Sequence, residues 1–371
     1  MRQERFKQQG EDSFFGRMVY DRIIPRDHFL MRLNETIPWQ RFTYKLVKYY
    51  RGRALEGRPP YDPATLLKML LVAYLYNLSE RQVEEVANFN LPVKCFLGLA
   101  ADELAPDHST LTAFKSRIIQ NGRLAAFEKL LADIIGIAQE QGIHFGSIQV
   151  MDSVHTLADV NVEKDEHRQD KEGKPPRDPN AKWGVKGSHW KKDENGKKVQ
   201  QTEYFCGYKS HVSLNAETGL ITSMVPTPGN AYDGHILPVL LEKDLAQGLP
   251  VDIVTADRAY DDSDNHVLLW SKGIHSAIRL HDYRTKKNDP NKAPWLELEA
   301  TPQYRQGLKE RYKIERKFGE AKQGHGLRRC RYVSIVRYGI QSFLTAIVLN
   351  LKRMVLLLTA VPFKGRAQAL A

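Results

Sequence analysis

Residues 308–322 of this 371-residue chain read LKERYKIERKFGEAK, and the interpretation of the rest of the sequence depends on this stretch. It consists mostly of strong helix formers and is followed by Gly324 and Gly326, so the sequence predicts a helix that ends near its last residue. At 100° per residue, one narrow stripe of that helix carries Leu308, Arg311, Glu315, Phe318 and Lys322. A single acid therefore stands between two cations.

The predicted helix lies in the most basic part of the chain. Eleven Lys/Arg and three Glu lie between residues 304 and 338, which accounts for most of the net charge of +11. The simplest interpretation is a solvated helix in which Arg311 and Glu315 form an i,i+4 ion pair that contributes about 0.3–0.5 kcal/mol. Taken alone, the stretch favours this interpretation, so a functional role must be argued from residues elsewhere.

Composition restricts the class of protein. A hydrophobic fraction of 42% with 9% aromatic residues is typical of a folded chain, and the length allows one large domain or two. The net charge of +11 suggests an anionic partner, most commonly nucleic acid. Cys95, Cys206 and Cys330 are far apart and form no zinc-type pair, which argues against a disulfide framework or structural zinc and fits a reducing, cytoplasmic setting.

One segment near each end of the chain is a candidate for a signal peptide or a membrane span. The polar start of the chain does not have the pattern of a signal peptide. The uncharged run at 338–351 is short and contains Gln341 and Asn350, so we expect a buried core helix there and no membrane partner.

The first part of the chain has the pattern of a helical domain, which we expect to comprise residues 1–143. Leucines on one face predict a helix at 64–76, and Ser79 with Gln82 forms a capping box for a second helix at 80–89. Two helices joined by a short turn have the outline of a helix-turn-helix, although an ordinary helical hairpin fits equally well.

From residue 144 the pattern changes to strands alternating with helices. Apolar runs predict strands at 147–152, 204–214, 220–225, 251–256 and 274–280, and amphipathic runs predict helices at 234–245, 262–272, 308–322 and 334–360. This order predicts an α/β domain over residues 144–360, with a mixed sheet flanked by helices, and a tail at 361–371. Residues 159–202 are charged and lack apolar periodicity, so we expect a solvated loop there.

Two aspartates follow predicted strands. Asp152 ends the first strand, and Asp257 follows the strand at 251–256. Carboxylates at strand ends project beyond the edge of a sheet, where α/β folds place functional groups. Each aspartate alone is more simply interpreted as a cap of the next element, but together with Glu315 they form a more specific set. Three converging carboxylates repel each other unless cations neutralise them, and oxygen ligands suit Mg²⁺ or Mn²⁺.

The residues of the opening stretch are spaced as in a known catalytic signature, Tyr-x2-Arg-x3-Glu-x6-Lys. Arg311, Glu315 and Lys322 match it in register, and Leu308 stands where tyrosine is expected. Upstream, ADRAYDD and MDSVHTLAD match the signatures of the other two acids. With these segments in this order, residues 20–350 resemble the DDE transposases of bacterial insertion sequences, whose catalytic domain has an RNase H-like fold.

Further segments carry the same resemblance. They are GYKSHV (207–212), TGLI (218–221), GNAYDG (229–234) and HGLRRCRY (325–332), together with RPPYDPATLLKMLLVAYLYNLSERQVEEV and PDHSTLTAF in the helical region. Ala259 stands where glycine is more common in the family. Neither this departure nor Leu308 removes an acid, so the resemblance implies an active enzyme.

The resemblance also implies residue roles. Asp152, Asp257 and Glu315 would be catalytic and would hold two divalent ions, Mg²⁺ or Mn²⁺. The side chains implied to contact DNA are Arg311, Lys322, Arg328, Arg329 and Arg331.

The implied reaction is metal-dependent cleavage at the ends of an insertion sequence, followed by strand transfer of the 3′-OH into target DNA. The implied partners are double-stranded DNA, comprising terminal inverted repeats and target, and a second copy of the chain in a homodimer on DNA. Residues 1–143 would recognise the ends, and the setting would be the bacterial cytoplasm, in association with the nucleoid. Two alternatives stay open: a metal-dependent nuclease without strand transfer, and an inactive DNA-binding protein derived from a transposase, against which the three acids argue.

Several other residues have competing interpretations. Asp233 precedes a predicted helix, and a cap is favoured over a role as the second acid. For His155 and His211, hydrogen bonding or phosphate contact is favoured over metal binding, because this chemistry prefers oxygen ligands. Tyr260 and Trp190 could stack on an unpaired base, but packing within the protein is favoured for both.

Overall fold

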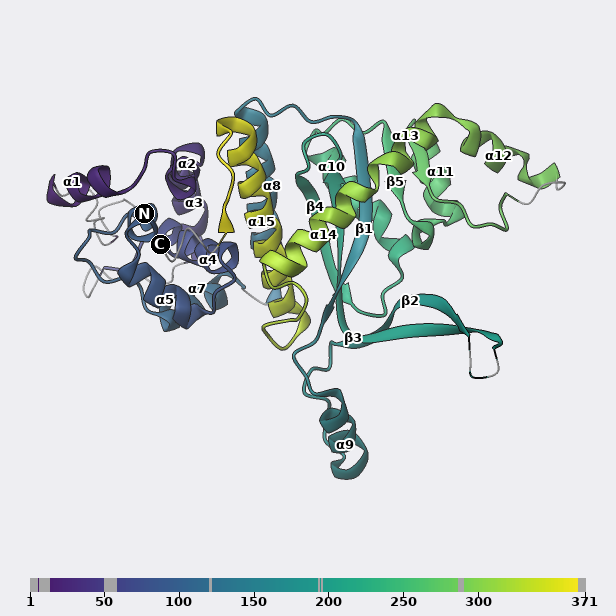
Figure 1. The fold of residues 1–371 in the computed structure, drawn as a ribbon, viewed down its shortest axis with the longest axis horizontal. Coiled ribbons are helices and arrows are strands. Elements are labelled where there is room, and N and C mark those ends of the chain that lie inside the picture. Colours follow the sequence, from purple (N-terminus) through teal and green to yellow (C-terminus); the bar gives the residue numbers. More distant parts are fainter. Residues whose placement is uncertain are drawn as a thin grey trace. The chain divides into compact units, whose positions relative to one another are not determined.

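The computed structural model of the protein describes residue 6 and residues 14–49, 59–119, 122–192, 194, 196–285 and 290–365 (Figure 1). The chain divides into two compact units, one formed by residues 1–127 and 347–371 and the other by residues 128–346. The domain limits expected at residues 143 and 360 stay predictions, and most of the tail at 361–371 lies outside the described residues.

The described part of the first unit is helical. Its elements are α1 (Phe14–Ile23), α2 (Phe29–Thr36), α3 (Trp39–Leu46), η3 (Val47–Tyr49), α4 (Pro63–Leu75), α5 (Glu80–Phe89), α6 (Leu91–Leu97) and α7 (His108–Ile118), and α8 (Ala125–Glu140) leads into the second unit. Every residue of α4 is buried, which makes it the central helix of the unit. The capping box of Ser79 and Gln82 is present in full at the start of α5, as the sequence predicts.

The second unit is built on one six-stranded sheet. Its strands are β1 (Ile148–Leu157), β2 (Lys182–Lys192), β3 (Lys198–Asn215), β4 (Ile221–Pro228), β5 (Ile253–Ala256) and β6 (His275–Ile278). The order is β2-β3-β1-β5-β6, and β4 pairs with the second half of β3. β3 runs antiparallel to its neighbours, whereas β1, β5 and β6 are parallel. This mixed sheet confirms the expected α/β, RNase H-like fold class.

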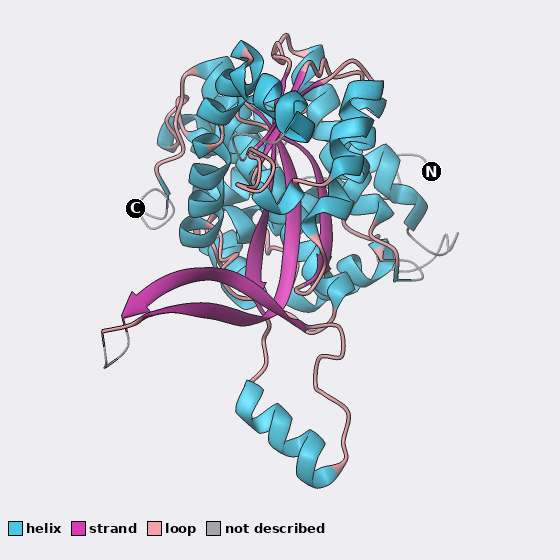
Figure 2. Cartoon of the chain, turned by 90° about the vertical axis from the view of Figure 1, so that its right-hand side faces the viewer, coloured by secondary structure: helices cyan, strands magenta, loops and turns pink. Residues whose placement is uncertain are grey.

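Helices cover both faces of the sheet (Figure 2). The helical elements that follow β4 are η5 (Asp233–Ile236), α10 (Leu237–Ala246), η6 (Arg258–Tyr260), α11 (Ser263–Ser271), η7 (Pro290–Lys292), α12 (Ala293–Ala300), α13 (Pro302–Glu310), α14 (Tyr312–Gly324) and α15 (Ile335–Thr359), which enters the first unit at residue 347. Of these, α10, α11, α13 and α14 contact strands of the sheet. On one face, residues of α10 and α11 form a buried cluster with residues of β1 and β5. In this cluster Leu240 of α10 lies with Met151 of β1 and Val254 of β5. On the other, Tyr338 of α15 stacks on Tyr208 of β3, with ring centroids 4.7 Å apart.

The expected solvated loop at 159–202 is wrong. This segment contains α9 (Val162–Glu172), all of β2 and the start of β3, and the two strands form an antiparallel ribbon (Figure 1). α9 is capped by Asn161 and ends at Gly173 in the left-handed region, but it buries no residue. An element without a buried face has no apolar periodicity, which is why the pattern did not indicate it.

Two further expectations need correction. The helix expected at 308–322 is in fact two helices, because α13 ends at Glu310 and α14 begins at Tyr312, with Arg311 between them. β1 continues to Leu157, so Asp152 lies within the strand and not at its end.

α15 is the one helix among the described residues that is long and apolar enough to cross a membrane by length and composition. In its most apolar window 67% of the residues are buried inside the protein, and Gln341 and Asn350 are fully buried. The core helix of a folded domain has the same properties, so α15 gives only weak support for a membrane span.

Candidate active site

The register of the parallel strands places Asp152 and Asp257 side by side. Met151 of β1 pairs with Ala256, the last residue of β5. The next residue on each strand is an aspartate, so the two carboxylates leave the same edge of the sheet next to each other. β5 ends here while β1 continues in its antiparallel pairing with β3, where Asp152 lies opposite Val212.

Burial makes the Asp152 carboxylate difficult to ionise. Its Oδ1 accepts a hydrogen bond from the backbone N–H of Ser153 at 2.7 Å, and its Oδ2 lies 3.8 Å from Nη2 of Arg311. Burial first, and the negative charge of Asp257 second, raise the pKa of Asp152 to about 7, while the Ser153 bond and Arg311 act in the opposite direction. The chain itself therefore compensates this charge only in part.

Asp257 combines a structural role with its position in the site. Its Oδ1 caps η6 by accepting from the backbone N–H of Ala259 at 2.9 Å, which is the capping role that the sequence allowed. Burial raises the pKa of this carboxyl, and the Ala259 bond and Arg311 oppose the shift. Capping and a place in the site are thus compatible.

Arg311 connects the third predicted acid to this pair. Its Nη2 lies 3.8 Å from Oδ2 of Asp152 and 3.7 Å from Oε1 of Glu315. Because both distances start at one nitrogen, the two carboxylate oxygens are no further apart than these distances combined. The side chain of Glu315 is 63% exposed, and the i,i+4 pair expected from the sequence is present. The break between α13 and α14 lies at Arg311, where the chain approaches β1.

The residues present fit divalent cations in part. Asp152 and Asp257 offer oxygen donors in a partly buried site with too little positive charge, which is the donor type that Mg²⁺ and Mn²⁺ prefer. Within the described ranges, no three His, Cys, Asp or Glu side chains meet at distances that would hold a metal ion. The structure therefore brings two of the predicted ligands together and holds Glu315 on the far side of Arg311.

A cavity of about 600 Å³ opens in front of the two aspartates. Its lining includes Asp152, Asp257, Asp233, Lys209 and the first residues of β2. The cavity has space for a nucleotide unit, and both charged and apolar groups reach its surface.

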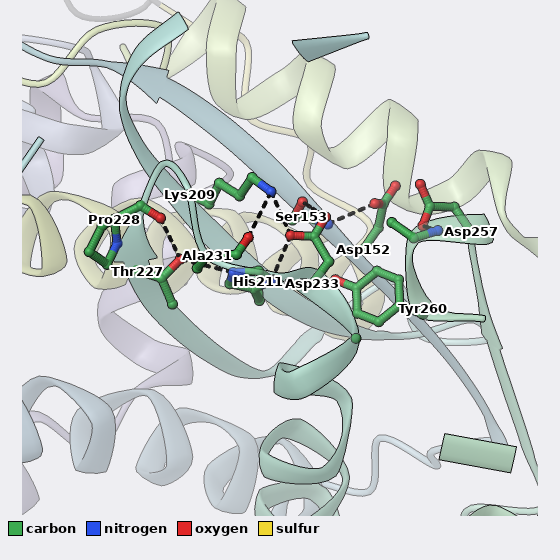
Figure 3. A network of polar contacts seen from close by, with 12 residues as sticks. Asp152, Ser153, Lys209, His211, Thr227, Pro228, Ala231, Asp233, Asp257 and Tyr260 are labelled. Carbon is green, nitrogen blue, oxygen red and sulfur yellow. Dashed lines mark hydrogen bonds and ion pairs between the residues drawn. The ribbon is translucent and has the colours of Figure 1, made fainter. Parts of the chain in front are cut away.

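Asp233, for which the sequence favoured a capping role over a place in the site, lines this cavity. Its Oδ1 accepts from Nζ of Lys209 at 2.6 Å, and its Oδ2 accepts from Oγ of Ser153 at 2.9 Å (Figure 3). The expected capping role is wrong, because no side chain caps η5 and Asp233 is the first residue of that helix. The signal available in the sequence was its place in GNAYDG, one of the segments that carry the family resemblance.

The two histidines near the site are held neutral by burial. The pKa of His211 falls to about 4, mainly because the ring is fully buried, and its Nε2 forms a hydrogen bond with Oγ1 of Thr227 at 2.9 Å. The pKa of His155 also falls to about 4, through burial and then through the charge of Lys322. His211 thus has the hydrogen-bonding role favoured by the sequence. Tyr260 is fully buried, as expected, whereas Trp190 is 67% exposed, contrary to the packing that the sequence favoured.

The predicted DNA-contacting cations lie beside the end of β1. Nζ of Lys322 lies 3.4 Å from Nε2 of His155, a residue that lines the cavity. Backbone bonds join the following segment to β1, from Leu157 N–H to Arg328 O at 3.1 Å and from Cys330 N–H to Leu157 O at 2.7 Å.

The three arginines of that segment differ in exposure. Arg328 and Arg329 are exposed, and Nε of Arg329 lies 3.6 Å from Asp159. Arg331 is half-buried, and its backbone N–H donates to Gln341. The structure brings the segment to the site, and contact of these side chains with DNA stays a prediction.

The fold and the neighbouring carboxylates define the class of protein: it is an RNase H-like protein with an acidic site at the edge of its mixed sheet. Residues 147–351 match the family model described as Transposase DDE domain, and residues 18–117 match the model described as Transposase domain (DUF772). The first match covers more than half of the chain. The chain therefore belongs to the DDE transposase family, of the type found in insertion sequences.

Two solved structures show a distant similarity. One is the cryo-EM structure of the piggyBac transposase synaptic complex with hairpin DNA, with 10% identity, a TM-score of 0.29, and coverage of 71% of this chain and 51% of that chain. This chain thus spans about half the length of the piggyBac chain. The other is the Mos1 transposase paired-end complex with left transposon end, with 13% identity, a TM-score of 0.20, and coverage of 84% and 91%. Similarity at this level does not bear on the site described above.

Proposed function

We propose that this protein cleaves DNA at the ends of an insertion sequence and joins the freed 3′-OH to target DNA. The observation that carries the proposal is the pairing of Asp152 with Asp257 at the edge of the sheet, with Arg311 between this pair and Glu315. This is the arrangement expected of a site that combines acids for metal ions with a cation for a phosphate group. Membership of the DDE transposase family supports it.

In this proposal, Asp152, Asp257 and Glu315 hold two Mg²⁺ or Mn²⁺ ions. Bound ions of this kind polarise a phosphoryl oxygen and lower the pKa of bound water. The chain supplies the positioning: the strand register holds the two aspartates, and the Arg311 guanidinium is presented to the phosphate. Nε of Arg311 is buried without a hydrogen-bond partner among the described residues, so the guanidinium has hydrogen-bonding capacity that the free protein does not use. A phosphate paired with Arg311 would compete with Glu315 for the guanidinium, and Glu315 would then be free to serve as the third ligand.

The proposed partner is double-stranded DNA, in the form of terminal inverted repeats and target, bound by a homodimer. Lys322, Arg328, Arg329 and Arg331 would contact the backbone on the path that leads away from the cavity, and residues 1–143 would recognise the ends. The reaction would take place in the cytoplasm, at the nucleoid of a bacterium.

The direct test is a cleavage and joining assay with DNA taken from both sides of the coding sequence, where inverted repeats mark the element ends. With Mg²⁺, the wild-type protein should nick these ends and form joined products with target DNA. Asp152→Asn and Asp257→Asn should remove both activities and leave DNA binding unchanged. Asp252→Asn is the matched control, because this exposed aspartate lies at the opposite end of β5.

The outcomes separate the alternatives. Nicks without joined product would identify a nuclease, and binding without nicks in the wild-type protein would identify an inactive relative. Mg²⁺-dependent cleavage by either Asn variant at the wild-type rate would overturn the assignment of the site.

A further inference from the structure

β2 and the first half of β3 leave the sheet as a two-stranded ribbon (Figures 1 and 2). The register pairs Trp183 with Cys206, Val185 with Tyr204 and Trp190 with Gln200. Residues 200, 204 and 206 of β3 differ by even numbers, so these pairs lie on one face of the ribbon. Three aromatic rings therefore share that face, which we call the aromatic face: Trp183, Tyr204 and Trp190.

The rings of the aromatic face are all more than half exposed to solvent. Trp183 is 52%, Tyr204 63% and Trp190 67% exposed, and none of them stacks on another ring in the part of the chain that the structure describes. Large apolar groups that lie together on a projecting element mark a surface that another molecule covers.

The charge of the ribbon indicates an anionic partner. Residues 182–206 contain six lysines against three acids. Near the tip, Lys192 pairs directly with Lys198, on the same face as the rings. Like charges directly opposite each other in an antiparallel pair are destabilising unless an anion lies between them. A phosphate group would relieve this repulsion.

The root of the ribbon is part of the active-site cavity. Trp183, Lys186 and the residues between them line the cavity together with Asp152 and Asp257. Trp183 thus connects the aromatic face with the candidate site, and Tyr204 and Trp190 lie on other pairs of the ribbon.

The root is also held closely by backbone packing. Gly184, Gly207 and Gly229 approach so closely there that a Cβ on any of them would collide with backbone atoms, and Gly229 N–H donates to Gly207 O at 2.9 Å. The direction in which the ribbon leaves the cavity is therefore set by the fold.

We propose that the aromatic face binds an unpaired DNA strand that leads away from the catalytic cavity. Bases would stack on Trp183, Tyr204 and Trp190 in turn, and phosphates would meet Lys192 and Lys198 at the tip. An unpaired strand fits better than a duplex, because the base faces that these rings need are hidden inside a double helix. The inference deepens the proposed function and rests on it for the identity of the strand as DNA released near the cleaved bond.

The test is fluorescence anisotropy of the full-length protein with a labelled oligo(dT) of about 16 nucleotides, the upper site size of single-strand binding folds. Trp190→Ala combined with Tyr204→Ala should weaken binding at least about ten-fold, and Trp190→Phe with Tyr204→Phe should restore it, because a phenyl ring still stacks. Binding of a duplex of the same length should change less than about three-fold, since phosphate contacts dominate it. Tyr283→Ala, which removes a ring that is 52% exposed elsewhere in the unit, is the matched control.

Three results would overturn the proposal. The first is oligo(dT) affinity that equals wild type in the double Ala variant. The second is an equal loss of oligo(dT) and duplex binding. The third is a change of oligomeric state in that variant with oligo(dT) affinity unchanged, which would assign the face to a second copy of the chain. Asp152→Asn should bind oligo(dT) like wild type, so failure of the cleavage assay and failure of this inference are distinguishable.

Discussion

Placing the carboxylates of Asp152 and Asp257 next to each other is energetically unfavourable. Both carboxyls have raised pKa values, mainly through burial, and Arg311 is the cation that opposes the shift for both. A chain selected only for stability would place apolar side chains at the edge of this sheet. A cation bound from solution would offset the repulsion between the two aspartates and would explain why they are found there.

The identity of the three acids could be predicted from spacing and family resemblance, because each lies in a segment with its own signature. Asp233 could not be predicted in the same way. Its role depends on Lys209 of β3 and Ser153 of β1, and no local pattern shows that the start of η5 lies beside these two strands. The break of the helix at Arg311 has a similar origin, since the approach of Arg311 to β1 is a tertiary contact.

At the residue scale, we predict that Asp233→Asn reduces Mg²⁺-dependent cleavage about 10- to 100-fold without abolishing it. The substitution weakens the charged contact that holds Lys209 and the bond from Ser153, the residue next to Asp152, so the acid would be less well positioned. A titration of cleavage rate against Mg²⁺ concentration measures the effect, and the midpoint should rise. A complete loss of activity, equal to that of Asp152→Asn, would show that Asp233 is itself a ligand.

At the scale of elements, α13 carries the chain to Arg311, and it can do so because Gly307 lies directly on the sheet. A Cβ at this position would collide with the side chain of Ala277 on β6 and would crowd Ile253 and Thr255 on β5. Gly319 in α14 has open space around it. The two glycines are therefore opposite cases within adjoining helices.

We predict that Gly307→Ala destabilises the protein by about 1–3 kcal/mol, because the helix must move away from the sheet. Gly319→Ala should instead stabilise by up to ~1 kcal/mol, since alanine is the better helix former and nothing obstructs it. Urea unfolding of the two variants beside wild type measures both free energies. Equal effects of the two substitutions would contradict the packing described for α13.

A second prediction for an element concerns Asp244 of α10, which is fully buried and accepts a hydrogen bond from Oγ of Ser213 at 2.5 Å. Burial raises the pKa of its carboxyl from 3.8 to about 6. A raised pKa in the folded state contributes stability below the unfolded pKa, and this contribution is lost as the pH rises through about 6.

The wild-type protein should therefore lose stability as the pH rises between the unfolded pKa of 3.8 and the folded pKa of about 6, whereas Asp244→Asn should not. Relative to wild type, the free energy of unfolding of Asp244→Asn should rise by about 1.4 kcal/mol per pH unit in this range. Thermal unfolding at a series of pH values measures the difference, with Asp252→Asn as the exposed control. A difference between Asp244→Asn and wild type that stays constant over this range would contradict the prediction.

The strands and helices that bury one face could be predicted from the sequence, since apolar periodicity reports burial directly. The segment at 159–202 could not, because α9 buries no residue and the ribbon of β2 and β3 is exposed over most of its length. Its strands are held by backbone pairing, which leaves no periodicity in side-chain polarity. The same exposure is what the proposed role of the ribbon as a surface for an unpaired DNA strand requires.

At the scale of the whole molecule, the net charge of +11 has a measurable consequence. Non-specific DNA affinity should fall steeply with salt, because each neutralised phosphate releases counterions. We predict that Arg328→Gln combined with Arg329→Gln reduces the magnitude of the slope of log K against log salt by about 2. Lys272→Gln, an exposed cation at the end of α11, is the control and should leave the slope unchanged.

The central claim is that Glu315 joins Asp152 and Asp257 in one metal-dependent site, although Glu315 pairs with Arg311 and is 63% exposed in the free protein. The most direct measurement is Mg²⁺-dependent cleavage of end DNA by Glu315→Gln, which keeps the size and the hydrogen-bonding capacity of the side chain. The account predicts that cleavage is lost while DNA affinity stays within about two-fold of wild type, since a single screened surface charge contributes little to binding. Cleavage by Glu315→Gln at a rate close to wild type would contradict it.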